Sequence, residues 1–213
     1  CYHFCPLCIC LNIIVRVRFI QAKFAFPWRR RGVLRDIKRP KGVLVRTGIL
    51  RVLDHSITLQ SGNTFRTLSL RTEQRRLGWE THHLTTPRHT EPYQDQETVD
   101  DWVFHRTPAP GGINLPVLRE RAEMAATEAR LNEIIPIIKP DILHAHSPVL
   151  NALPAIRAGR RHGIPVNYEV RAFWEDAAAS HGSTTEGSLR YRMTRALETR
   201  ALKRANSVTT ICE

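Results

Sequence analysis

The sequence predicts an α/β protein with a doubly wound, mostly parallel sheet. Residues 140–170 read as strand, helix and strand over about thirty residues, which is the length of a βαβ unit. Strand-like and helix-like segments alternate from Gly48 onward, and this order favours a parallel sheet flanked by helices. Apolar residues make up 42% of the 213 positions, an ordinary share for a protein that buries a core.

The spacing of apolar residues predicts three strands and two helices in the first part of this region. They are a strand over Ile49–Leu53, a helix from Phe65 to Leu77 that stops at Gly78, strands over Trp79–Thr85 and Trp102–Arg106, and a helix over Leu118–Ile138. Between them, the acidic and polar segment Glu91–Asp101 is predicted to be an exposed loop. Pro136 is expected to break or kink the last turn of its helix.

The second part is predicted to hold the βαβ unit, then one further helix and one further strand. These elements are a buried strand around Ile142–Ala145, a helix over Asn151–His162, a strand over Ile164–Val170, a helix over Ser188–Ala205 and a strand from Ser207 to Cys212. The helix over 188–205 places Leu189, Met193, Leu197 and Ala201 on one face.

Residues 1–47 differ in composition from the rest of the chain. Residues 1–48 hold 11 Lys and Arg against one acid, so most of the net charge of +12 lies there. A nucleic-acid-binding domain would carry its basic patch on the folded surface, so no nucleic-acid partner is predicted. We interpret 1–47 as a basic leader that is disordered or translated upstream sequence, and 48–213 as the folded domain. The alternative is a leader that touches anionic membrane.

The same leader contains four of the five cysteines. Cys5 and Cys8 have the spacing of half a zinc site, but no second pair of ligands follows at a suitable distance. No metal site is therefore predicted.

Polar residues stand at the carboxyl ends of the two strands of the βαβ unit. His146 ends the first strand, and Glu169 and Arg171 end the second. Ligands of open parallel sheets bind where the carboxyl ends of the strands open. These three side chains are therefore predicted to line one crevice, with His144 buried or behind them.

Several segments in a fixed order resemble a known enzyme family. They include Val52-Leu-Asp-His-Ser56, Gln60-Ser-Gly62, Leu143-His-Ala-His-Ser-Pro148, Tyr168-Glu-Val-Arg-Ala-Phe-Trp-Glu-Asp176 and Glu186-Gly-Ser-Leu-Arg-Tyr-Arg192. From about Ile49 to Glu213 the chain resembles the amino-terminal half of a retaining family 4 glycosyltransferase of the GT-B fold. Within that family it resembles the subgroup associated with exosortase and PEP-CTERM exopolysaccharide loci.

The resemblance implies a protein of two Rossmann-like domains, of which 48–213 is the acceptor-side one, truncated before the donor-binding domain. It implies a nucleotide-sugar donor as substrate, a glycan or lipid-linked acceptor, and no separate cofactor or metal. Transfer is expected to follow a front-face displacement assisted by the donor phosphate. The expected location is the cytoplasm, with peripheral contact at the inner face of the plasma membrane. The chain alone is expected to be inactive.

The resemblance also assigns roles to residues. His146 is the catalytic candidate, since a histidine there contacts the donor sugar in similar enzymes; the alternative is a strand-end histidine that binds a backbone carbonyl. Ser61 and Gly62 are candidates for the donor phosphate, or form a helix N-cap. Asp54 and His55 are candidates for the acceptor. Candidates for the sugar or acceptor, or else members of an ion-paired loop, are Glu169, Arg171, Trp174 and Glu175.

Two other functions stay open from the sequence. One is a stand-alone, non-catalytic Rossmann-like binding module, although neither G-x-G-x-x-G nor a P-loop is present. The other is a fragment of a GT-B hexosamine epimerase, which shares the architecture. A nucleic-acid-binding protein built on the basic leader is a weaker third reading, which salt-dependent binding would support.

Overall fold

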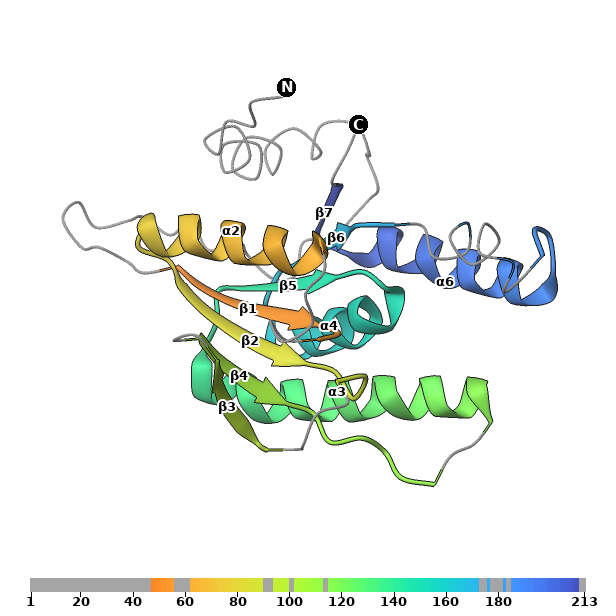
Figure 1. Cartoon of the computed structure of the whole chain (residues 1–213), viewed down its shortest axis with the longest axis horizontal. Helices are drawn as coiled ribbons and strands as arrows, with labels where there is room; N and C mark the ends of the chain where they lie inside the picture. The colour runs from red at the N-terminus through yellow and green to blue at the C-terminus, as the bar shows by residue number, and fades with distance from the viewer. Residues whose placement is uncertain are drawn as a thin grey trace.

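The computed structural model describes residues 47–55, 62–89, 94–99, 102–112, 115–172, 176, 182 and 185–210, with the backbone alone at 62–68. Its elements are β1 (Gly48–Leu53), α2 (Gly62–Arg76), β2 (Glu80–Thr85), β3 (Gln96–Val99), β4 (Trp102–Arg106), α3 (Pro116–Ile138), β5 (Ile142–His146), α4 (Val149–His162), β6 (Val166–Val170), α6 (Leu189–Arg204) and β7 (Ser207–Thr210). The described strands form one seven-stranded sheet in the order β3-β4-β2-β1-β5-β6-β7 (Figure 1).

The sheet is doubly wound and mostly parallel, as the sequence predicts. Neighbouring strands are parallel except β3 and β4, which are antiparallel. From β1 the chain moves outward to β2 and β4, and from β5 it moves outward in the other direction to β6 and β7. The winding therefore reverses between β1 and β5, which is where ligands bind in sheets of this kind.

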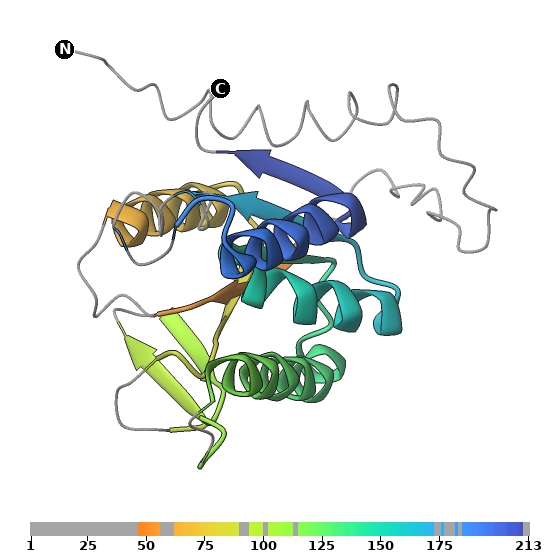
Figure 2. The same cartoon turned by 90° about the vertical axis from the view of Figure 1, so that its right-hand side faces the viewer.

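Helices cover both faces of the sheet. Figures 1 and 2 show α3, α4 and α6 on one side and α2 on the other. The main hydrophobic core lies on the side of α3 and α4, where Leu50 and Val52 of β1 meet Leu143 and Ala145 of β5. The close fit of α4 against β6 depends on Gly159, because a Cβ there would lie only 2.8 Å from Ile164 O.

The ends of the helices follow signals in the sequence. Gly78, the predicted stop after α2, and Gly163, which follows α4, have positive φ values of 80° and 70°. Glycine adopts this left-handed conformation without the steric cost of a Cβ. Ser188 caps α6, since its Oγ accepts a hydrogen bond from Tyr191 N at 3.2 Å.

One prediction about the elements was wrong. The predicted loop Glu91–Asp101 contains the edge strand β3, which pairs Gln96 with His105 and Val99 with Trp102. Its alternating side chains are exposed or half-buried, so the segment lacks the apolar pattern that marks a strand. Pro136 lies in the last turn of α3, as predicted, and the helix ends two residues later at Ile138.

The other predicted elements are present within one to three residues where the structure describes them. On α6, however, Leu189 and Met193 are exposed, while Tyr191, Glu198 and Ala201 are buried. Apart from Thr47, the predicted leader and its cysteines lie outside the described residues.

Candidate functional site

The face of the sheet beneath α2 is polar although it is buried. One row of side chains that are neighbours across the strands consists of Phe104, His83, Arg51, His144, Asn167 and Ser207. Strands of a parallel sheet covered on both sides are usually apolar on both faces. Burying polar and charged groups costs free energy unless they bind one another, so this face is where a function is expected.

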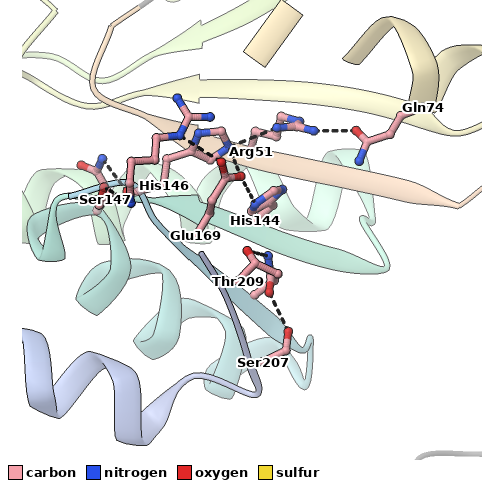
Figure 3. A network of polar contacts seen from close by, with 11 residues as sticks. Arg51, Gln74, His144, His146, Ser147, Glu169, Ser207 and Thr209 are labelled. Carbon is pink, nitrogen blue, oxygen red and sulfur yellow. Dashed lines mark hydrogen bonds and ion pairs between the residues drawn. The ribbon is translucent and has the colours of Figure 1, made fainter. Parts of the chain in front are cut away.

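Arg51 joins the two strands between which the winding reverses. Its side chain in β1 is fully buried. One guanidinium nitrogen, Nη1, lies 3.1 Å from His146 Nε2 at the end of β5, and Nη2 donates to Gln74 Oε1 of α2 at 2.6 Å (Figure 3). Three elements therefore meet on one guanidinium.

Glu169 of β6 lies beside the two histidines of β5. Its Oε2 lies 2.9 Å from His144 Nε2 and 3.9 Å from His146 Nε2, and its Oε1 accepts from Arg171 Nε at 3.1 Å (Figure 3). The rings of His144 and His146 are 4.6 Å apart between centroids. The side chain of Glu169 is 3% exposed, so its carboxylate is enclosed by these partners.

The buried groups have shifted pKa values. Burial, the largest cause, lowers the pKa of His144 below 6.5 and that of His146 well below it, against the opposing effect of Glu169. Burial would raise the pKa of Glu169, but His146, His144 and Arg171 together hold it well below 4.5. Near neutral pH the site therefore contains two neutral imidazoles and one carboxylate between guanidinium groups.

Backbone contacts fix the ends of β5 and β6 in place. Arg171 N donates to Ser147 Oγ at 3.1 Å, and Ser147 N donates to Glu169 O at 2.9 Å. Asn151 Nδ2 of α4 donates to His146 O at 3.0 Å. The side chains of His146 and Arg171 are thus held on a rigid support, which a precise binding site requires.

His144, His146 and Glu169 offer three possible metal ligands within 4.8 Å of one another. The donor set of two imidazoles and one carboxylate would suit a divalent cation. However, Nε2 of His146, which lies 3.9 Å from Glu169 Oε2, already lies 3.1 Å from Arg51 Nη1. A cation bound through Nε2 would have to displace this buried guanidinium, so the arrangement fits a network of polar contacts better than a metal centre.

A second polar group lies at the end of β1. Asp54 Oδ1 accepts from Thr86 Oγ1 at 3.3 Å, and Arg88 Nη1 lies 4.0 Å from Asp54 Oδ2. Burial raises the pKa of Asp54 above 3.8, while Arg88 and Asn151 oppose the shift. His55 beside it is exposed. Asp54 thus adds a partly accessible carboxyl group to the edge of the sheet that carries His146.

The structure brings together His146, Glu169 and Arg171, as predicted from the strand ends, and it buries His144. Gly62 is the first residue of α2. Ser61, Trp174 and Glu175, the other predicted site residues, lie outside the described residues.

Sequence reasoning missed Arg51 and Gln74, together with a stacked arginine beside them. Arg71 of α2 lies 3.8 Å above the ring centroid of Trp102, and its guanidinium nitrogens have no hydrogen-bond partner among the described residues. Burial, with Arg51 and Arg75 nearby, lowers the pKa of Arg71 to about 9. The available signal was a charge in the middle of an apolar strand, Leu50-Arg51-Val52.

Solved structures with a similar fold define the class of protein. Sucrose-phosphate synthase from Thermosynechococcus elongatus matches with a TM-score of 0.57 and 12% identity, over 76% of this chain and 42% of that one. MurG from Acinetobacter baumannii matches with a TM-score of 0.50 and 13% identity, over 78% and 41%. A putative UDP-N-acetylglucosamine 2-epimerase from Listeria monocytogenes matches with a TM-score of 0.51 and 13% identity, over 78% and 40%.

These matches place the chain in the Rossmann-like GT-B class, and the chain spans well under half the length of each of the three proteins. At such identities they establish the fold alone. No curated protein sequence matches the chain.

The family is established by the sequence itself. The model of a family described as glycosyl transferase 4-like domain matches residues 61–213, which is more than half of the chain. The chain belongs to this glycosyltransferase family, as the resemblance predicted.

Proposed function

We propose that this chain is the acceptor-side domain of a retaining glycosyltransferase that moves a sugar from a nucleotide-sugar donor to a glycan or lipid-linked acceptor. The observation that carries the proposal is the match of residues 61–213 to the glycosyl transferase 4-like family. The buried polar network at the reversal between β1 and β5 supports it, because this is the ligand-binding position of the fold.

His146 is the proposed contact to the donor sugar. It ends β5 beside Glu169 and is held by contacts from β1 and α4. A hydrogen-bond donor that is already in position, in a site with little water, stabilises the charge that develops on the sugar during transfer. Asp54 and His55 are the proposed acceptor contacts, Gly62 and Ser61 the proposed neighbours of the donor phosphate, and Glu169 and Arg171 the groups that hold the sugar end of the site in shape.

The proposed setting is exopolysaccharide assembly at the cytoplasmic face of a membrane. Helices α4 and α6 carry nine exposed basic residues, here called the basic surface: Arg157, Arg160, Arg161, Arg190, Arg192, Arg195, Arg200, Lys203 and Arg204. Neighbouring Arg200, the largest cause, lowers the pKa of Arg204, with smaller effects of Arg160 and Arg157. Such concentrated positive charge suits anionic lipid, in which a lipid-linked acceptor would sit. No helix within the described ranges has the length and apolar content of a membrane span.

The function is tested by incubating the complete gene product that contains this chain with a panel of nucleotide sugars and glycan or lipid-linked acceptors. We expect release of nucleoside diphosphate that depends on acceptor, and a product whose anomeric configuration matches the donor. Interconversion of the nucleotide sugar without an acceptor would instead indicate the epimerase. Binding of a ligand without either of these reactions would indicate a binding module.

A further inference from the structure

The guanidinium group of Arg51 is held beside one ring nitrogen of His146, Nε2. The side chain of Arg51 is fully buried, Gln74 Oε1 accepts from Nη2 at 2.6 Å, and Nη1 lies 3.1 Å from His146 Nε2. One side of the guanidinium group thus contacts Gln74 of α2, and the other side faces His146 at the end of β5 (Figure 3).

This contact determines which nitrogen of His146 carries the proton. A guanidinium group has only hydrogen-bond donors, so the nitrogen that faces it must be an acceptor. Burial lowers the pKa of His146 well below 6.5, so the ring is neutral near pH 7 and carries a single proton. That proton is therefore on Nδ1.

His144 faces a group of the opposite charge. Its Nε2 lies 2.9 Å from Glu169 Oε2, although the pair does not have the geometry of a hydrogen bond. Because a carboxylate only accepts, this short distance favours a proton on Nε2 of His144, the opposite tautomer to that of His146. Glu169 does not compete for His146, from which it is 3.9 Å away.

The proton on Nδ1 of His146 has no acceptor in the described part of the chain, and Nδ1 is shielded from solvent. Buried donors are nearly always paired in native proteins, so an unpaired one at a site indicates a ligand group. The ligand atom must be an acceptor, such as the oxygen of a sugar hydroxyl.

We propose that Arg51 is a positioning residue that fixes the neutral, Nδ1-protonated tautomer of His146, so that His146 donates a hydrogen bond to a ligand oxygen and removes no proton from it. This inference rests on the proposed contact of His146 with the donor sugar. A general base needs a free lone pair, but the lone pair of Nε2 faces Arg51. Protonation of Nε2 would place two cations 3.1 Å apart.

The tautomer is measured directly by ¹⁵N NMR of the histidine-labelled 213-residue chain, with the signals assigned by His146→Gln and His144→Gln. We expect His146 to be neutral at pH 7 with its proton on Nδ1, and His144 to carry its proton on Nε2. Arg51→Lys, which keeps a cationic donor, should keep the His146 tautomer. Arg51→Met, which removes the donor at similar size, should shift it toward Nε2 and raise the pKa of His146.

A proton on Nε2 of His146 in the wild-type chain would overturn the proposal, and so would a tautomer unchanged in a folded Arg51→Met chain. If the Arg51→Met chain does not fold, the wild-type and Arg51→Lys spectra still show which nitrogen of His146 carries the proton. In the complete gene product, Arg51→Met should lower kcat about 10- to 100-fold with little change in KM. This loss should be smaller than that caused by replacing His146, which donates the hydrogen bond. A correct tautomer without any sugar transfer would refute the proposed function and leave the role of Arg51 toward His146 intact.

Discussion

Individual ionisable residues on the polar face of the sheet have pKa values that differ from those they would have in water. Burial lowers the pKa values of His83, His144 and His146, so each is neutral in the folded chain where it would begin to protonate in the unfolded chain. Glu169 stays ionised beside the guanidinium group of Arg171. The stability of the domain is therefore linked to pH through these residues.

We predict that the domain loses stability as the pH falls below about 6.5, the unfolded pKa of histidine. Between the folded and unfolded pKa values the unfolded chain binds more protons, so each histidine contributes up to about 1.4 kcal/mol per pH unit. Asp54, whose pKa is raised, acts in the opposite direction in the window just above 3.8. Urea unfolding between pH 8 and 5 measures the slope; stability that is constant or rises toward pH 5 contradicts the prediction.

Replacement of Glu169 tests the network of charges. Glu169→Gln keeps the shape but removes the negative charge that faces Arg171, so we expect a loss of about 1–3 kcal/mol in the free energy of unfolding. The control is Glu80→Gln, which removes a carboxylate that contacts only His82 among the described pairs and is 54% exposed. This control should cost less than about 1 kcal/mol. Equal losses in the two variants would show that the buried carboxylate has no special role.

At this scale the sequence predicted part of the site. His146, Glu169 and Arg171 follow from the rule that polar residues at strand ends converge, since β5 and β6 are adjacent. Arg51 and Gln74 did not follow, because their contacts join strands and a helix 95 and 23 residues apart. No local pattern in the sequence encodes such pairs.

At the scale of the elements, a buried carboxylate attaches α6 to the rest of the domain. Glu198 Oε2 accepts from Tyr168 Oη of β6 at 2.8 Å, and its Oε1 accepts from Val149 N at 3.2 Å. Val149 is the first residue of α4, whose N-cap Pro148 provides no side-chain cap. Glu198 thus supplies from another helix the anionic acceptor that the start of α4 lacks.

We predict that Glu198→Ala destabilises the domain by about 1–3 kcal/mol, because a buried hydroxyl and a helix N–H lose their acceptor. The matched control is Glu133→Ala on α3, where an exposed carboxylate pairs with Arg130. Chemical denaturation compares the two variants. A loss for Glu198→Ala no larger than that of the control would mean that α6 is held by its apolar contacts alone.

The elements themselves were largely predictable, and the exception has a physical reason. β1 and β5 are short, mainly apolar segments, β6 alternates apolar and polar residues, and α4 carries helical periodicity. β3 has three polar residues and one apolar residue at the sheet edge, and its strand form depends on pairing with the backbone of β4. A pattern of apolar side chains does not report such pairing.

At the scale of the whole molecule, the basic surface of α4 and α6 is the feature open to a partner. We predict that this domain binds vesicles with anionic lipid, and that Arg160→Ala with Arg204→Ala weakens binding about 30-fold, at about 1 kcal/mol for each residue. Arg121→Ala, at an exposed position of α3, is the control. Binding that persists on neutral vesicles, or that is unaffected by salt, would contradict an electrostatic contact.

The account as a whole depends on a sugar site at the reversal between β1 and β5. The most direct test compares His146→Ala with His162→Ala in an acceptor-dependent transfer assay of the complete gene product. His162 lies on α4 and contacts only Asn132 among the described polar partners, so its loss should leave kcat unchanged. We predict that His146→Ala lowers kcat about 100-fold or more. Equal activity of both folded variants would contradict the assignment of the site.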